Sequence, residues 1–291
     1  MDYSKNSSGP YDDLLEWMRQ NEDPRTKNWF MVHETPTAIW GLTAAYLMFV
    51  LWLGPLMMKG RAAFELRGFM ISYNLFQVGL SLYMVTEIIY SMFINGYHPI
   101  CQPFSAKTAH LNPLELRMAQ ALWWYYISKP IEFMDTVLMV LRKKNSQITF
   151  LHVFHHATMF NIWWFCIRLI PGGQGWLASS LNSFVHVFMY TYYLLNLFPS
   201  VRKYLWWKRY ITQLQLCQFV IVLVHTVNTY LSGCDFPMWS IVMLTAYMVI
   251  LIALFTNFYV NAYKSKCEVR AVSNGKHSSR VDNNFNHVKS N

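Results

Sequence analysis

Three histidines stand close together in an apolar stretch near the middle of the chain. They are His152, His155 and His156, in the pattern His-x-x-His-His. Offsets of three and four put side chains on one face of a helix, so we expect the three imidazoles to face the same space. A single histidine in such a helix would more often be a hydrogen-bonded core residue. Three together predict a site, because polar groups persist in apolar helices where they line a cavity or do chemistry.

Other apolar stretches carry polar residues at helical spacing. One such set, Lys129, Glu132 and Asp135, can also be read as an ion pair that neutralises itself so that its helix can enter a membrane. Glutamines in apolar helices often serve only as interhelical hydrogen bonds. We predict that His186 takes part in catalysis and that the other polar residues of these stretches contact the substrate. The sets are Lys129, Glu132 and Asp135; Asn182, His186 and Tyr190; and Gln215 and Gln218.

Two chemistries suit clustered imidazoles. Membrane desaturases and hydroxylases hold two irons in histidine boxes, but only five of the 10 histidines in this chain lie near the predicted site. That number is too small for a di-iron shell, whereas a single metal ion on this helix stays an alternative. The other chemistry is acyl transfer, in which a neutral imidazole is the nucleophile and a second one acts as base. No cysteine neighbours the histidines, so a thiol nucleophile has no obvious counterpart.

The elements that hold these residues are predicted to be membrane helices. Of the 291 residues, 54% are apolar and 13% are charged, whereas soluble domains carry about 25% charged residues. A helix needs about 20 apolar residues to cross a bilayer, and seven stretches reach that length. They are residues 37–58, 68–95, 114–141, 147–170, 176–198, 210–231 and 237–263. The fold class is therefore all-α and polytopic, with a polar segment 1–36 before the helices and a polar tail 264–291 after them.

The basic residues indicate how the chain is oriented. With a luminal N-terminus, 16 of the 24 Lys and Arg residues fall on the cytosolic side, as the positive-inside rule requires. They stand at the ends of apolar stretches, so membrane topology explains the net charge of +9 better than nucleic-acid binding does. Asn6 begins a glycosylation sequon on the luminal side. Cys101 and Cys234 fall in luminal connections, where a disulfide can persist, although two unpaired loop cysteines remain possible.

The depth of the polar residues suggests the kind of substrate. Asp135 lies about 10 Å, and His155 about 12 Å, from the cytosolic ends of their helices at 1.5 Å per residue. The luminal halves of the same helices are mainly aromatic and aliphatic. A polar vestibule that leads into an apolar tunnel suits an acyl-CoA, whose phosphates would meet the basic cluster that begins at Arg142.

Four ordered motifs give the chain a family resemblance. Lys129-x-x-Glu132-Phe133-x-Asp135-Thr136 precedes the histidine pattern, and His186-x-x-Met189-Tyr190-x-Tyr192-Tyr193 and Thr212-x-x-Gln215-x-x-Gln218 follow it. This arrangement resembles the very-long-chain fatty-acid elongases. Residues 160–164 and 203–208 resemble the subgroup that acts on polyunsaturated acyl chains. The resemblance implies six helices in a barrel around a closed acyl-CoA tunnel, a first helix outside it, and His155 as the residue that carries the acyl group.

The resemblance also implies the reaction. A 3-oxoacyl-CoA synthase would condense malonyl-CoA with a long-chain acyl-CoA in the endoplasmic reticulum membrane, without a metal or organic cofactor. His186 and His156 would be the activating and stabilising partners of His155. His152 would be structural, and Asp135 with Lys129 would orient the histidines. Reductases and a dehydratase of the later steps are expected partners. Lys289 matches the dilysine-type retrieval ending that family members often carry, whereas His287 stands at the other position of that signal. The rival functions are a di-iron desaturase or hydroxylase and a non-enzymatic lipid transporter or receptor.

Overall fold

The computed structural model describes residues 9–109 and 111–261, which are helical and contain no β-strand. Seven long helices in this part of the chain match the seven predicted stretches to within three residues at every end. The first is continuous from Pro36 to Met58 and comprises α2 (Pro36–Met48), a π-helical turn (Phe49–Leu53) and α3 (Gly54–Met58). The others are α4 (Arg67–Ile94), α6 (Pro113–Leu141), α7 (Phe150–Leu169), α8 (Gly175–Leu195), α9 (Lys208–Leu231) and Met238–Asn261. Shorter helices are α1 (Pro10–Asn21), α5 (Ala106–Ala109), and the 3₁₀ turns Asn145–Gln147 and Arg202–Tyr204.

Four of the long helices are both long and apolar enough to cross a membrane. They are Pro36–Met58, Arg67–Ile94, Lys208–Leu231 and Met238–Asn261. The remaining three, α6 to α8, have 20 to 29 residues but carry the ionisable and polar side chains of the predicted site, which lower their mean hydropathy. The chain is thus a multi-pass membrane protein, and composition alone identifies fewer spans than the seven that were predicted.

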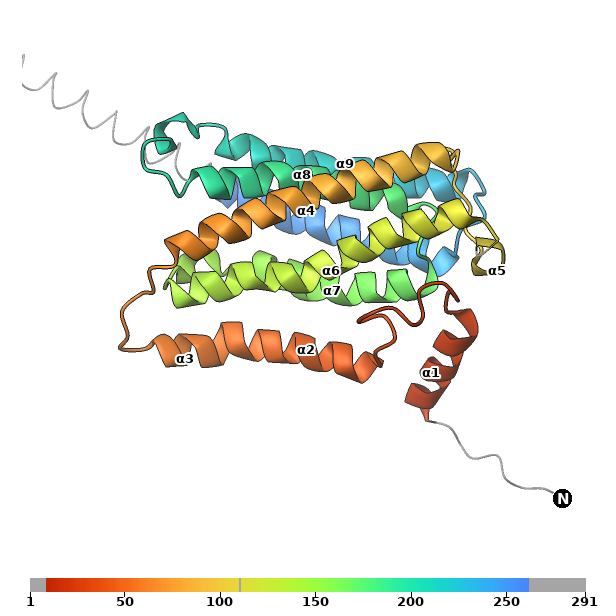
Figure 1. The fold of residues 1–291 in the computed structure, drawn as a ribbon, viewed down its shortest axis with the longest axis horizontal. Coiled ribbons are helices and arrows are strands. Elements are labelled where there is room, and N and C mark those ends of the chain that lie inside the picture. The colour runs from red at the N-terminus through yellow and green to blue at the C-terminus, as the bar shows by residue number, and fades with distance from the viewer. Residues whose placement is uncertain (1–8, 110, 262–291) are drawn as a thin grey trace, which may run out of the picture.

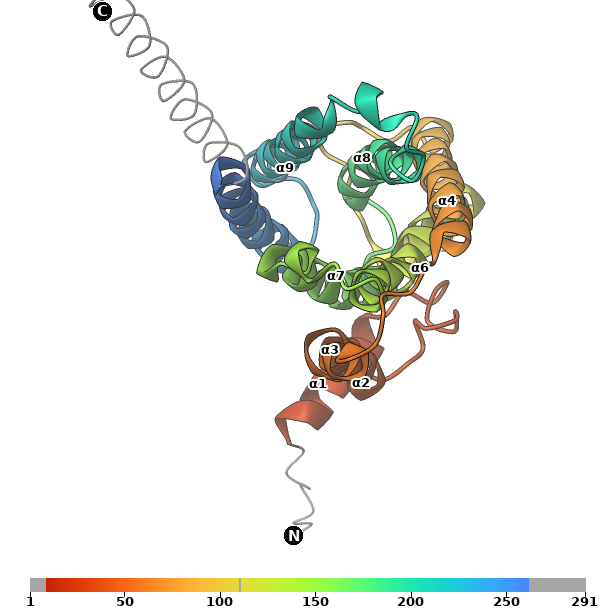
Figure 2. The same cartoon turned by 90° about the vertical axis from the view of Figure 1, so that its left-hand side faces the viewer.

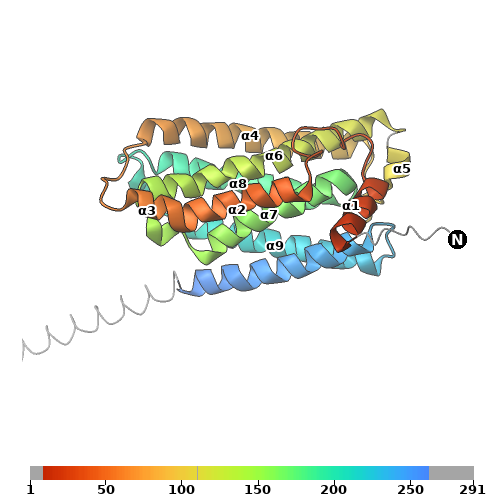
Figure 3. The same ribbon diagram turned by 90° about the horizontal axis from the view of Figure 1, so that it is seen from below.

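The long helices surround a common axis. α4 packs against α6 and α8, α7 packs against α6, and α9 packs against α8. Figure 2 shows these helices and Met238–Asn261 around the axis, with α2 and α3 outside, against α7 and α6. Figures 1 and 3 show that they all run roughly along the long axis of the molecule.

Local sequence signals set where the helices of the site begin. Asn112 accepts a hydrogen bond from the amide of Leu114 (3.0 Å), and proline follows it at the first helical position of α6. At the start of α7, Thr149 accepts from the amide of His152 (3.3 Å). The three histidines therefore occupy the first two turns of α7, near one end of the bundle.

A glycine lets the outer helix approach the ring. A Cβ at Gly54 would lie 2.7 Å from Val140 Cγ1 and 2.8 Å from the Phe49 carbonyl oxygen. The π-helical turn ends at Leu53, two residues before Pro55, which has no amide hydrogen to donate to the helix. Together these features bring α3 against the last turns of α6.

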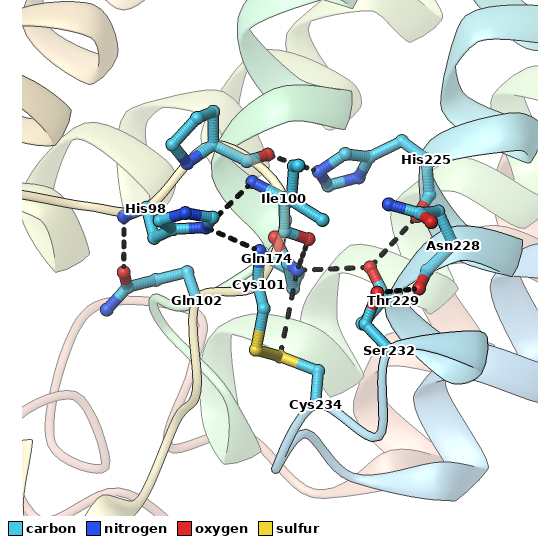
Figure 4. The surroundings of a disulfide bond; sticks show 11 residues. His98, Ile100, Cys101, Gln102, Gln174, His225, Asn228, Thr229, Ser232 and Cys234 are labelled. Carbon is cyan, nitrogen blue, oxygen red and sulfur yellow. Dashed lines mark hydrogen bonds between the residues drawn. A yellow bond between two sulfur atoms is a disulfide. The ribbon is translucent and has the colours of Figure 1, made fainter.

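The opposite end of the bundle is tied together by covalent and polar contacts. A disulfide joins Cys101, in the α4–α6 connection, to Cys234, which follows α9 (Figure 4); we call this end the disulfide end. Arg168, in the last turn of α7, pairs with Glu22 (3.0 Å) and donates to the Glu34 carbonyl (3.0 Å). These contacts hold the segment after α1 across the end of α7.

Candidate active site

A long cavity runs inside the ring from the histidines toward the disulfide end. It contains about 970 Å³ of space between protein atoms, part of which is open to solvent. Its lining begins at His155 and Asn182 and reaches Ile170 and Gln174. Ile170 lies 15 positions after His155, which corresponds to a rise of about 22 Å along α7, and most of the lining between them is aliphatic or aromatic. The space has the length and polarity for an extended hydrocarbon chain.

His155 is the histidine of the box that lines this cavity. Its side chain is partly exposed, and in the described part of the chain no hydrogen bond or ion pair involves its ring. His156 lies next to it, with ring centroids 5.5 Å apart, but is 7% exposed and does not line the cavity. The prediction that all three imidazoles face one space is therefore wrong. Successive helical residues differ by about 100°, which is enough to separate the cavity from the helix interface.

Glu132 lies behind the histidines, and four side chains approach its carboxylate. Oε1 accepts from Lys129 Nζ (2.8 Å) and Ser128 Oγ (2.9 Å) and lies 3.4 Å from His186 Nδ1. Oε2 lies 3.9 Å from His156 Nδ1 and is buried without a hydrogen-bond partner among the described residues. This carboxylate is thus placed to orient two imidazoles from two helices.

Lys129 connects that carboxylate to the cavity wall. Its ammonium also donates to Asn182 Oδ1 (3.3 Å) and lies 4.2 Å from the centre of the Tyr125 ring. Tyr125 donates to the same Asn182 oxygen (2.7 Å). Because Asn182 and Tyr125 line the cavity and Lys129 does not, the ion pair acts on that space through them.

Asp135 belongs to a second buried network, next to the first. Tyr190 donates to Asp135 Oδ2 (2.7 Å), and Gln77 of α4 donates to the Tyr190 hydroxyl (3.2 Å) and to that of Tyr73 (3.3 Å). Asp135 and Tyr190 do not line the cavity. They fix the packing of α4, α6 and α8 beside His186, whose ring centroid is 5.6 Å from that of Tyr190.

His152 is held by Thr136 of α6 and, through it, by the helix that lies outside the ring. Its Nε2 is 2.9 Å from Thr136 Oγ1, which is 2.8 Å from the hydroxyl of Tyr46 in α2. The same ring packs against His156, with centroids 4.4 Å apart. This geometry suits the positioning role that was expected of His152.

The remaining predicted residues separate. Gln218 lines the cavity, and its Oε1 is buried without a partner among the described residues. Gln215 does not line the cavity; its amide lies 3.9 Å from Met189 Sδ. Arg142 caps the C-terminal end of α6, away from the cavity lining. Asn6 and the residues after 261 lie outside the described residues.

Sequence reasoning missed Tyr125, Tyr73, Tyr46 and Gln77. The tyrosines stand in aromatic or aliphatic surroundings, where a hydroxyl gives no periodic signal. Gln77 is an isolated amide in an apolar helix. Such amides often make interhelical hydrogen bonds, so Gln77 is the residue among these four that could have been predicted.

The arrangement suits acyl transfer. A free imidazole faces an apolar channel, and a carboxylate orients its neighbours from behind. Within the described ranges, no group of three or more His, Cys, Asp or Glu side chains is arranged to hold a metal ion. The imidazole of His152 instead lies against Thr136, and that of His186 lies against Glu132.

Comparison with known proteins decides the family. The GNS1/SUR4 family (ELO) matches residues 31–271. The chain belongs to this family. It is 44% identical to very long chain fatty acid elongase 2 of Rattus norvegicus, over 90% of this chain and 92% of that protein. It is 43% identical to elongase 4 of Homo sapiens, over 89% of this chain and 81% of that protein, and 46% identical to elongase 5 of Rattus norvegicus, over 84% and 80%. The resemblance to the elongases is confirmed, and membership supports fatty-acid elongation and lipid metabolism as the class of function.

Proposed function

We propose that this elongase-family chain is a 3-oxoacyl-CoA synthase that condenses malonyl-CoA with a long-chain acyl-CoA. One observation carries the proposal: the imidazole of His155 faces the apolar cavity without a hydrogen bond to any described residue, while its neighbours are held in networks. A nucleophile needs an uncommitted lone pair, and a long acyl chain needs an apolar channel that begins at that nucleophile.

The reaction divides into two half-reactions. His155 attacks the thioester carbon, the C–S bond breaks, and CoA leaves as the free thiol, its sulfur taking up the N–H proton that the acylated imidazole releases. Malonyl-CoA then loses carbon dioxide, and its electron pair becomes an enolate. The enolate attacks the acyl-imidazole, the new C–C bond forms as the C–N bond breaks, and the imidazole recovers a proton from solvent.

The neighbouring groups assist these steps. His186 and His156, which lie near the Glu132 carboxylate, are the activating and stabilising partners of His155. Lys129 with Asp135 keeps the histidines in place, and Asn182 and Gln218 meet the substrate where they line the cavity. Tyr190 and Gln215 act indirectly, through packing, and Arg142 meets CoA phosphates at the channel entrance. The step needs no metal or organic cofactor, because the thioester and the malonyl carboxylate supply the driving force.

The proposal includes a topology and a location. Six helices form a barrel that closes the tunnel, and seven cross the endoplasmic reticulum membrane, with the N-terminus luminal and the C-terminus cytosolic. Segment 1–36 is luminal, 37–263 is the elongase domain, and 264–291 is a cytosolic tail. The disulfide supports this orientation, because such bonds persist in the oxidising lumen. Reductases and a dehydratase of the elongation cycle take the product.

Polyunsaturated chains are the proposed substrates. Tyr125 and Trp163, in edge-to-face contact at 4.5 Å between centroids, line the cavity with His155, and such aromatic surfaces suit the flat double bonds of these chains.

The deciding assay uses purified full-length protein, labelled malonyl-CoA and a panel of acyl-CoAs. We expect labelled 3-oxoacyl-CoA two carbons longer than the primer, together with carbon dioxide and free CoA. If malonyl-CoA is not consumed with any primer, the protein is a carrier or receptor and the proposal is wrong.

A further inference from the structure

The far end of the cavity is polar, which the sequence analysis did not predict. Gln174, in the turn before α8, lines the cavity together with His225 and Thr229 of α9. These residues lie beside the disulfide (Figure 4), on the opposite side of the apolar stretch from His155. A tunnel for a plain hydrocarbon chain has no need of hydrogen-bonding groups at the place that the methyl end reaches.

The hydrogen bonds of these three side chains use their donors and leave acceptors unmet. The Gln174 amide nitrogen donates to the Ile100 carbonyl (2.6 Å) and to Thr229 Oγ1 (3.0 Å). The Thr229 hydroxyl gives its own proton to the His225 carbonyl (2.9 Å). Gln174 Oε1 is then buried with no partner among the described residues, in a side chain that is 7% exposed.

His225 adds a second acceptor. Its Nε2 lies 2.9 Å from the Pro99 carbonyl, which can only accept, so Nε2 carries the hydrogen. In the neutral ring, Nδ1 then keeps its lone pair. The polar floor of the cavity, formed by Gln174, His225 and Thr229, therefore calls for a hydroxyl or another donor.

From this geometry we infer that the cavity accepts acyl chains that end in a hydroxyl group, that is, ω-hydroxyacyl-CoA primers. The inference deepens the proposed function and rests on it, because the thioester must lie at His155. The rise of about 22 Å between the two ends corresponds to roughly 17 carbon atoms, at ~1.3 Å per carbon for C–C bonds of about 1.5 Å. A terminal hydroxyl on a chain of this length donates to Gln174 Oε1.

The length dependence gives the inference a sharp signature. A hydroxyl buried without a partner is strongly disfavoured, so on a shorter chain it would lie in the apolar stretch and bind poorly. At the matching length it satisfies an acceptor that a methyl group leaves unmet. Sites that bond a substrate hydroxyl discriminate well against analogues that lack it.

The test compares kcat/KM for ω-hydroxy and methyl-ended saturated acyl-CoAs of 12 to 20 carbons, roughly bracketing the estimated length, in wild-type full-length protein. We expect the hydroxy-to-methyl ratio to be below about 0.1 for the shortest chains and to rise at least tenfold to a maximum near the matching length. A ratio that stays below 0.1 at every length, with methyl-ended chains still elongated, overturns the inference and leaves the proposed function standing. Failure to elongate any chain overturns both.

A substitution identifies the acceptor. Gln174→Met keeps the size of the side chain and removes Oε1, so the ratio at the maximum should fall about tenfold. Ser232→Ala is the matched control, because Ser232 stands at the same end of α9, bonds the Asn228 carbonyl (2.7 Å) and does not line the cavity. A maximum that survives Gln174→Met contradicts Gln174 Oε1 as the acceptor, because the hydroxyl is then bound by the second acceptor, His225 Nδ1. If Gln174→Met does not fold, the length series in the wild type still decides.

Discussion

Removing the buried cation behind the histidines should destabilise the protein more than removing both charges. Lys129 and Glu132 are each 1% exposed and bonded at 2.8 Å. Lys129→Met removes the lysine cation beside the Glu132 carboxylate and leaves it the hydrogen bond from Ser128 and the nearby imidazoles of His186 and His156. Breaking one side of a buried pair costs about 3–5 kcal/mol.

That cost can be measured as a change in melting temperature. At about 2–4 °C per kcal/mol for chains of 150–250 residues, Lys129→Met should lower the midpoint by roughly 6–20 °C. The double variant Lys129→Met/Glu132→Gln, which removes both charges, should recover at least half of the loss. Tryptophan fluorescence of the detergent-solubilised protein, heated at one fixed scan rate, gives the midpoints of the wild type, of Lys129→Met, of Glu132→Gln and of the double variant. A midpoint for Lys129→Met within 2 °C of wild type would refute the view that these charges depend on each other.

Three further predictions concern topology, the disulfide end and the substrate. Asn6→Gln should abolish a glycosidase-sensitive mobility shift. Glycan attachment at a sequon engineered into residues 142–145 would contradict the proposed orientation. Cys101→Ser should remove a mobility change seen without reductant and lower stability by up to about 4–5 kcal/mol, since the bond closes a loop with a sequence separation of 133; an unchanged mobility would mean that Cys234 is unpaired in the cell. Polyunsaturated acyl-CoAs of about 18 to 22 carbons, just above the roughly 17 carbons that the cavity length spans, should turn over faster than saturated ones, and a clear preference for saturated chains would contradict the subgroup assignment.

The helices could be predicted well because their ends have local causes. α6 was expected at 114–141 and runs Pro113–Leu141, since Asn112 and the following proline define its start. The segment that crosses the disulfide end could not be predicted. Its path depends on Arg168, which is 146 residues from Glu22 in the chain.

The candidate site was predictable as a set of polar faces but not as an arrangement. Helical spacing placed His155 and His156 together, although only the neighbouring helices decide that one meets the cavity and the other meets Glu132. Gln174 stands in a turn, where no periodicity marks it, and its significance depends on an unpaired oxygen that only the structure reveals.

The most direct test of the central claim is the release of CoA in the absence of malonyl-CoA. Wild-type protein incubated with acyl-CoA alone should release about one equivalent of CoA and gain the mass of one acyl group, which neutral hydroxylamine removes. His155→Ala should release none, whereas His33→Ala, an exposed histidine near Glu34, should behave as wild type. If wild-type protein releases no CoA until malonyl-CoA is added, the covalent intermediate at His155 is contradicted, and a single-step condensation with His155 as base replaces it.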